Sequence, residues 1–238
     1  MTRFPWLTVA GVAVGGWALL SIVSRRSSSA SPQGAADTGS GLGYVPAVAS
    51  TVTLPEFLPL ALMMDGHTVV VNVSEDYLPP MRGSQAQLVA DQAGAMFPTR
   101  KMVDAIYDAA PIKLPFHAES ADRSSAATIA RHLAQIAVDR AGRQGVAMGQ
   151  QKSYVVSNTW QPGRIVIYGG RYADGGLVQP LSGPVHADGY VDYSQGAELV
   201  KRQAWIDGAE VDLARALQDP ATAGILSDEG VILDVRYS

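Results

Sequence analysis

The chain has 238 residues, a formal net charge of −4 and no cysteine. With 18 Lys and Arg against 22 Asp and Glu, it has no electrostatic footprint for a phosphate backbone, so we expect no nucleic-acid partner. The lack of cysteine excludes disulfides, thiolate metal sites and a cysteine nucleophile.

The first predicted element is a helix that spans a membrane. Residues 4–23 carry no charge, and at about 1.5 Å per residue this run crosses a hydrocarbon core of about 30 Å. Trp6 and Trp17 suit the two interfaces, and Arg25 with Arg26 forms a charged stop. The alternative is a cleaved secretory signal, whose apolar core is usually shorter. We predict a single-pass anchor over residues 1–26, with the globular domain outside the cytoplasm.

A flexible tether is expected after the anchor. Residues 27–43 are mostly Ser, Gly and Ala, and such a composition cannot bury enough apolar surface to offset the entropy lost on ordering. The remaining residues, 44–238, are enough for one globular domain with a sizeable core.

The first half of this domain predicts one strand followed by three helices. In chain order these are a strand at 68–74, a helix at 84–93 capped by Ser84, a helix that begins after a Thr99 cap and ends before Pro111, and a helix at about 125–141.

The second half predicts mainly strands. The expected strands are at 154–157, 164–168, 190–194 and 199–206, with Asp207-Gly208 as a hairpin turn, followed by short helices at 212–217 and 222–226. Helices clustered before a run of strands indicate an α+β domain with a mainly antiparallel sheet, not a repeating βαβ order.

The richest group of candidate catalytic residues lies at 182–196. On the predicted strand, Asp192 and Ser194 share one face with Tyr190, while Tyr193 takes the other, and His186 reaches that face from the preceding loop. Such a group suits a metal held by His and Asp, or a general base oriented by a carboxylate. The alternative is a polar loop in which Asp and Ser stabilise turns.

Basic residues near the late strands are candidate ligand-binding residues. Lys152 precedes one strand, and Arg164 and Arg171 flank another, where each is placed to bind a carboxylate or phosphate. The alternative is a solvated strand end. A phosphate-binding glycine loop, an H-E-x-x-H helix and a G-x-S-x-G elbow are all missing from the sequence, and no motif identifies a cofactor.

Four phrases within residues 96–230 resemble an uncharacterised family of bacterial and phage proteins. They are PTRKMVDAIY at 98–107, GRIVIYG at 163–169, QPL at 179–181, and the segment that begins with HADGYVDYS at His186 and ends at Gly196. Six polar residues agree with the pattern of that family: His132, Lys152, His186, Asp192, Tyr193 and Ser194. His132 thereby joins Lys152 and Arg171 as a predicted ligand-binding residue.

The chain departs from the histidine-rich pattern of that family at three positions. Gln150, Arg171 and Gln195 stand where the family carries imidazoles. If those imidazoles act as ligands or proton-transfer groups, this chain has lost most of them.

A weaker similarity relates residues 186–192 to zinc D-Ala-D-Ala peptidases. His186 and Gly189 fit the spacing of that family, but Asp192 falls one residue early and no later histidine completes the zinc ligands. The sequence therefore leaves metal binding undecided.

Two functions remain open from the sequence. The first is a membrane-anchored hydrolase that acts on a cell-envelope polymer such as peptidoglycan. In it His186 is the base or a ligand, Asp192 is the orienting group or a second ligand, and Tyr193 or Ser194 contributes hydrogen bonds. The second is a non-catalytic envelope or virion protein that uses the same fold to bind a partner.

Overall fold

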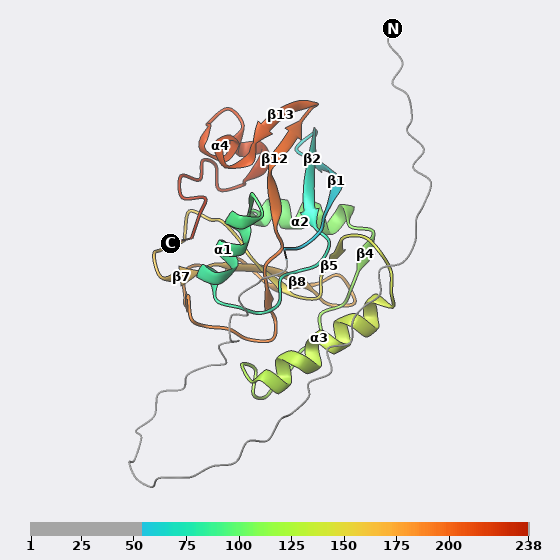
Figure 1. Ribbon diagram of the computed structural model, residues 1–238. Helices are drawn as coiled ribbons and strands as arrows, with labels where there is room; N and C mark the ends of the chain where they lie inside the picture. The colour runs from blue at the N-terminus through green and yellow to red at the C-terminus, as the bar shows by residue number, and fades with distance from the viewer. Residues whose placement is uncertain (1–53, 238) are drawn as a thin grey trace, which may run out of the picture. The chain divides into compact units, whose positions relative to one another are not determined.

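The computed structural model describes residues 54–237, which form a mixed α+β domain with mainly antiparallel sheets (Figure 1), as predicted. The predicted anchor at 4–23, the tether at 27–43 and the expected start of the domain at residue 44 lie outside the described residues. Within 54–237, no helix combines the length and the apolar character needed to cross a bilayer.

The larger sheet has five strands and is antiparallel throughout. Its main path runs in the order β1-β2-β12-β13, and the short β3 also pairs with β12. The bounds are Phe57–Met64 for β1, His67–Ser74 for β2, Ala95–Met96 for β3, Val200–Ile206 for β12 and Ala209–Asp212 for β13. Along β2, Val69, Val71 and Val73 are fully buried because alternate residues of a strand face the core.

Two-residue turns close both hairpins of this sheet. Asp65-Gly66 joins β1 to β2, with φ angles of 50° and 85°. Asp207-Gly208 joins β12 to β13 as predicted, with φ angles of 49° and 84°. Positive φ at both turn positions matches the right-handed twist of the strands, which explains the Asp-Gly sequence at each turn.

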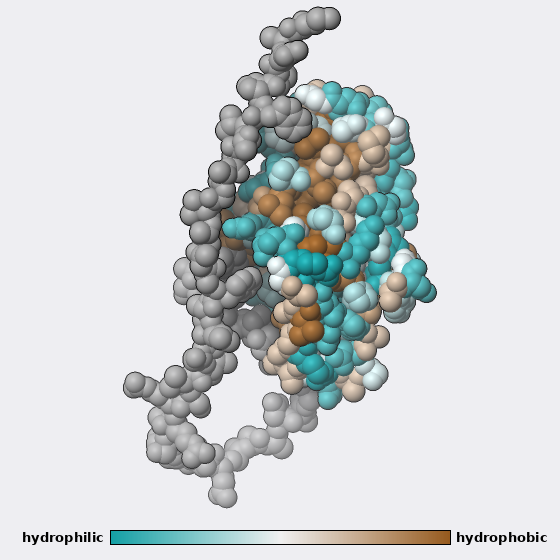
Figure 2. Space-filling model, turned by 90° about the vertical axis from the view of Figure 1, so that its right-hand side faces the viewer, coloured by the Kyte–Doolittle hydropathy of each residue, from teal (hydrophilic) through white to brown (hydrophobic). Residues whose placement is uncertain are grey.

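Among residues 54–237, β1 forms one edge of the sheet. Met64 pairs with His67 across the two-residue turn, so alternation places the backbone nitrogen of Pro59 toward the open edge. A proline is tolerated there because its missing N–H serves no ladder bond. Met63 is 71% exposed, and Figure 2 shows apolar residues gathered on the side of the domain that carries β1.

The second sheet has four strands in the order β11-β6-β8-β9. The bounds are Gln195–Gly196 for β11, Lys152–Tyr154 for β6, Ile167–Arg171 for β8 and Leu177–Gln179 for β9. Two small pairs accompany it: β7 (Arg164–Ile165) with β10 (His186–Ala187), and β4 (Ile112–Lys113) with β5 (Ala147–Met148). One continuous apolar core joins residues of both sheets, including Val71 of β2 and Ile167 of β8.

Five helices complete the described domain. They are α1 (Gly83–Gln92), α2 (Arg100–Ala109), α3 (Ala126–Arg140), α4 (Leu213–Gln218) and α5 (Ala223–Leu226). The predicted Thr99 cap of α2 is confirmed, because its hydroxyl accepts the N–H group of Met102, and the Ser125 hydroxyl caps α3 in the same way by accepting the N–H group of Thr128. The Ser84 cap is wrong: Arg82 occupies the N-cap of α1, and Ser84 lies inside the helix.

The predicted order of elements is only partly correct. β1 and β2 both precede the helices, and short strands lie between the helices. Residues 164–168 divide between β7 and β8, and the strand expected at 154–157 is instead β6, which ends at Tyr154. The strand at 190–194 is absent, since Asp192 Oδ1 accepts both the backbone N–H and the hydroxyl of Ser194, and such local bonds compete with a sheet ladder.

Candidate functional site

Asp192 is at the centre of the polar group predicted at 182–196. Its side chain is 1% exposed, and its two oxygens accept four hydrogen bonds. Oδ1 accepts the backbone N–H of Ser194 at 2.9 Å and its hydroxyl at 2.5 Å, while Oδ2 accepts the Arg123 guanidinium at 2.9 Å and the Tyr190 hydroxyl at 3.1 Å. A carboxylate offers about four acceptor sites, so Asp192 has no free lone pair for a metal or a substrate proton.

The Asp192 carboxyl group is held in its ionised form. Burial alone would raise the pKa of this carboxyl, but the Lys152 ammonium and the bonds from Ser194 and Arg123 outweigh burial and hold the pKa below its ordinary value. Asp192 is therefore a fixed negative charge that positions its neighbours.

Lys152 brings a buried cation to the same cluster. The residue is 6% exposed, and no described residue accepts a hydrogen bond from its Nζ or forms an ion pair with it. Burial lowers the pKa of this ammonium, Asp192 opposes that effect, and Arg123 adds to it. With Arg123 also present, two cations face one carboxylate.

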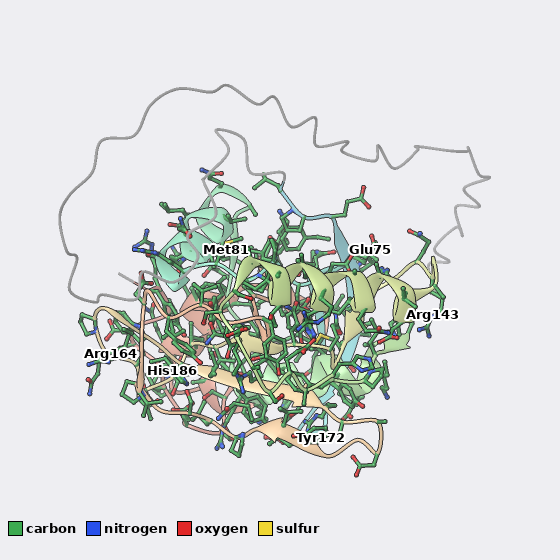
Figure 3. All side chains as sticks on the ribbon, turned by 90° about the horizontal axis from the view of Figure 1, so that it is seen from below. Glu75, Met81, Arg143, Arg164, Tyr172 and His186 are labelled. Carbon is green, nitrogen blue, oxygen red and sulfur yellow. The ribbon has the colours of Figure 1, made fainter. Side chains whose placement is uncertain are left out.

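His186 lies at the more exposed side of the cluster. Its ring stacks on the Tyr190 ring with centroids 4.6 Å apart, and no described residue hydrogen-bonds its nitrogens. Burial and then the charge of Lys152 lower the pKa of the imidazole. Figure 3 shows His186 beside Arg164, at the opposite end of the domain from Arg143. The imidazole is thus neutral near pH 7, with its nitrogens available.

Contacts at both ends fix the segment that carries these groups. Asp188 accepts the backbone N–H of Ser84 at 2.6 Å and its hydroxyl at 2.8 Å, which ties the segment to the start of α1. Tyr193 is buried, and its hydroxyl accepts the backbone N–H of Glu119 at 2.7 Å. Tyr193 therefore anchors the segment and does not face a ligand.

His132 of α3 lies behind this segment. It is 1% exposed and packs edge-on against Tyr193, with ring centroids 4.9 Å apart. Within the described residues, neither ring nitrogen makes a hydrogen bond of ordinary geometry, and burial lowers the pKa of the imidazole against a smaller opposing effect of the Gln150 backbone. His132 is a neutral core histidine next to the cluster.

The predicted site residues thus divide into two groups. His186, Asp192, Ser194 and Lys152 come together, although Ser194 is fully buried and directs its hydroxyl at Asp192. Arg171 does not join them: it forms an ion pair with Asp104 and lies over the Tyr107 ring.

Two members of the cluster were not predicted as site residues. Arg123 comes from the loop before α3, which contains no recognisable motif, and its contact with Asp192 joins residues far apart in sequence. Gln195 pairs with Lys152 between β11 and β6, and because these strands run parallel and in register, both side chains leave the same face of the sheet. The only sequence signal that pointed to Gln195 was its position directly after the Asp-Tyr-Ser phrase at 192–194.

Within residues 54–237, no group of three or more His, Asp and Glu side chains is arranged to hold a metal ion. Comparisons of the chain with protein-family models, with curated proteins and with solved structures found no match. The resemblance to an uncharacterised bacterial and phage family therefore stays a prediction.

Proposed function

We propose that this domain is a hydrolase that acts on a cell-envelope polymer, with His186 as its general base. The observation that carries the proposal is a half-buried imidazole with a lowered pKa and no hydrogen bond to the described residues, next to a positively charged cluster. Displaced pKa values concentrated among neighbouring side chains are typical of catalytic sites.

The chemistry proposed for His186 is hydrolysis of an amide. The neutral imidazole takes a proton from water while the water oxygen attacks the carbonyl carbon, and the imidazolium then returns that proton to the departing amine. The products are a carboxylic acid and an amine. Arg123, whose side chain is 44% exposed and whose charge acts on the His186 imidazole, is the group that stabilises the negative charge on the carbonyl oxygen in this proposal.

Asp192 takes the part of a positioning residue in this proposal. It orients Arg123 and Tyr190, and Tyr190 in turn supports the His186 ring. The proposed location outside the cytoplasm rests on the uncharged run at 4–23, which would hold the domain near the polymer.

Replacement of His186 by Gln tests the proposal. Purified full-length chain is incubated with peptidoglycan sacculi, with and without added zinc, and soluble fragments are quantified. We expect release by the wild type and at least about 100-fold slower release by His186→Gln, which is the usual contribution of a general base. His67→Gln is the matched control, because His67 lies in the other sheet and bonds only Asp207. Equal rates for wild type and His186→Gln would exclude the base role, and no release at all would exclude the hydrolase.

A non-catalytic binding protein is the second candidate. It is favoured by the saturation of Asp192 with four donors and by the burial of Ser194, which leave neither side chain free to react. In this case His186→Gln leaves partner binding and stability nearly unchanged.

A further inference from the structure

A cavity separate from the cluster around Asp192 lies where α1, β3, α4 and the C-terminal segment meet. Its volume is about 380 Å³, within the range typical of ligand pockets. The last described residues lie beside α1 (Figure 1), where Arg236 forms an ion pair with Asp91. We call this space the β3 cavity, and its lining includes Asp91, Ala95, Met96, Arg202, Ala214 and Gln218.

The edge of β3 leaves one peptide group without a partner. The N–H of Arg202 donates to the Gly94 carbonyl at 3.1 Å, so these two residues are a hydrogen-bonded pair of the antiparallel ladder. The next pair, Ala95 with Lys201, is then a non-hydrogen-bonded pair, and Ala95 directs its N–H and its C=O away from β12. Among the described strands, β3 pairs only with β12, and no other described group bonds either atom.

An unpaired peptide group is unfavourable at this position. Ala95 is 3% exposed, and buried backbone N–H and C=O groups are nearly always hydrogen-bonded. Because Ala95 borders the β3 cavity, an occupant of the cavity is adjacent to both groups. A second peptide group in extended conformation offers one acceptor and one donor, which is how an open sheet edge binds an additional strand.

The charges around the β3 cavity favour an uncharged occupant. Asp91 is paired with Arg236 at 2.7 Å, and Arg202 is paired with Asp212 at 2.9 Å. Two arginines are thus balanced by two carboxylates. A charged side chain in the cavity would lose its hydration without gaining an unmatched partner.

The other buried groups of the lining do not compete with Ala95 for an occupant. The Gln87 amide donates to Asp91 Oδ1 at 2.9 Å and accepts the Tyr237 N–H at 3.0 Å. Met96 and Ala214 are buried and apolar. The Ala95 peptide group is therefore the part of the buried wall that is left to recognise an occupant.

We infer that the β3 cavity binds a short, uncharged peptide segment of a partner protein, which pairs with Ala95 as an added strand. The cavity has the size of a small-ligand site, so it takes a short segment and not a folded surface. The inference goes beyond the proposed function and does not depend on it, because the residues that line the cavity are not members of the cluster around Asp192.

The test compares two peptides that differ in their hydrogen-bond donors. Acetyl-Val-Ala-Val dimethylamide contains β-branched residues that favour an extended backbone, and the control peptide carries a methyl group on each peptide nitrogen, so that it cannot donate. The full-length chain is titrated with each peptide while the Ala95 amide is followed by NMR. We expect saturable binding of the first peptide, with a downfield shift and slower hydrogen exchange of the Ala95 N–H, and no binding of the control.

Two variants identify the site. Ala95→Pro removes the N–H, which is tolerated where that group serves no ladder bond, and it is expected to weaken binding at least about 10-fold. Gln218→Trp keeps the test decisive if Ala95→Pro does not fold, because Gln218 is exposed on α4 and the indole occupies the cavity that it lines. The matched control is Arg215→Trp, which lies exposed on the same helix outside the lining and is expected to leave the affinity unchanged.

Several results would overturn the inference. These are equal binding of the two peptides, no saturable binding of the first, or unchanged affinity in Ala95→Pro and Gln218→Trp. A dimer of the full-length chain that Gln218→Trp separates would also overturn it, because a second copy then occupies the cavity. Failure to release fragments from sacculi removes only the hydrolase and leaves the peptide site in place.

Discussion

Asp192→Asn is expected to destabilise the full-length chain by about 1–3 kcal/mol, the usual cost of leaving a buried hydrogen-bonding group without its partner. The amide nitrogen of Asn cannot accept a hydrogen bond, so at least one of the donors on Arg123, Tyr190 and Ser194 loses its acceptor. Denaturant unfolding followed by fluorescence measures the change. The matched control is Asp228→Asn, which breaks the exposed ion pair with Arg100 and is expected to cost at most about 1 kcal/mol.

The effect of Asp192→Asn also has a defined pH dependence. The pKa of Asp192 is held below its ordinary value of 3.8, so the folded state binds the proton less readily than the unfolded state. The stabilisation is therefore fully present above about pH 4 and is lost as the pH falls through the lowered pKa. The difference between wild type and variant should shrink on acidification, and a difference that is independent of pH would contradict this account.

Glu198→Gln is expected to have the opposite effect and to stabilise the protein. Glu198 is fully buried; Oε1 accepts the Ser74 hydroxyl at 3.0 Å, while Oε2 has no partner among the described residues. Burial raises the pKa of this carboxyl well above 4.5, the Ser74 bond opposes the rise, and Asp76 adds to it. The folded chain thus holds a proton that the unfolded chain releases, and glutamine has the shape of that neutral acid.

The gain from Glu198→Gln should grow with pH. Wild-type stability is complete below pH 4.5 and declines above it, because keeping the proton costs about 1.4 kcal/mol per pH unit until the folded pKa is reached. The gain is therefore larger at pH 7 than at pH 5. Unfolding midpoints from pH 4 to pH 8 measure it, with the exposed Glu210→Gln as control. Parallel curves for wild type and Glu198→Gln would show that the carboxyl ionises in the folded state.

Local signals in the sequence predicted the elements whose cause is local. The Thr99 cap and the Asp207-Gly208 turn depend on residues within a few positions of one another, and both are confirmed. The prediction of a strand at 190–194 was wrong. The alternating residue pattern predicted it, but the Asp192 carboxylate accepts hydrogen bonds from the Ser194 backbone and from the distant Arg123 in place of a sheet ladder.

The site was predictable in composition but not in arrangement. His186, Asp192 and Lys152 were identified by their polar types and by the family resemblance, and the structure brings them together. Arg123 and Gln195 complete the cluster through contacts that only folding creates, between segments 69 residues apart in one case and across a parallel strand pair in the other. No pattern along the chain encodes such pairings.

The proline at the open edge of β1 bears on how copies of this chain behave when they are crowded. An apolar edge strand normally exposes unpaired backbone N–H and C=O groups, with which a strand of a second chain can pair. Pro59 interrupts that row of groups in its middle, since one outward position has no donor to give. At high concentration, copies of the domain would therefore stay separate at this edge instead of growing into a shared sheet.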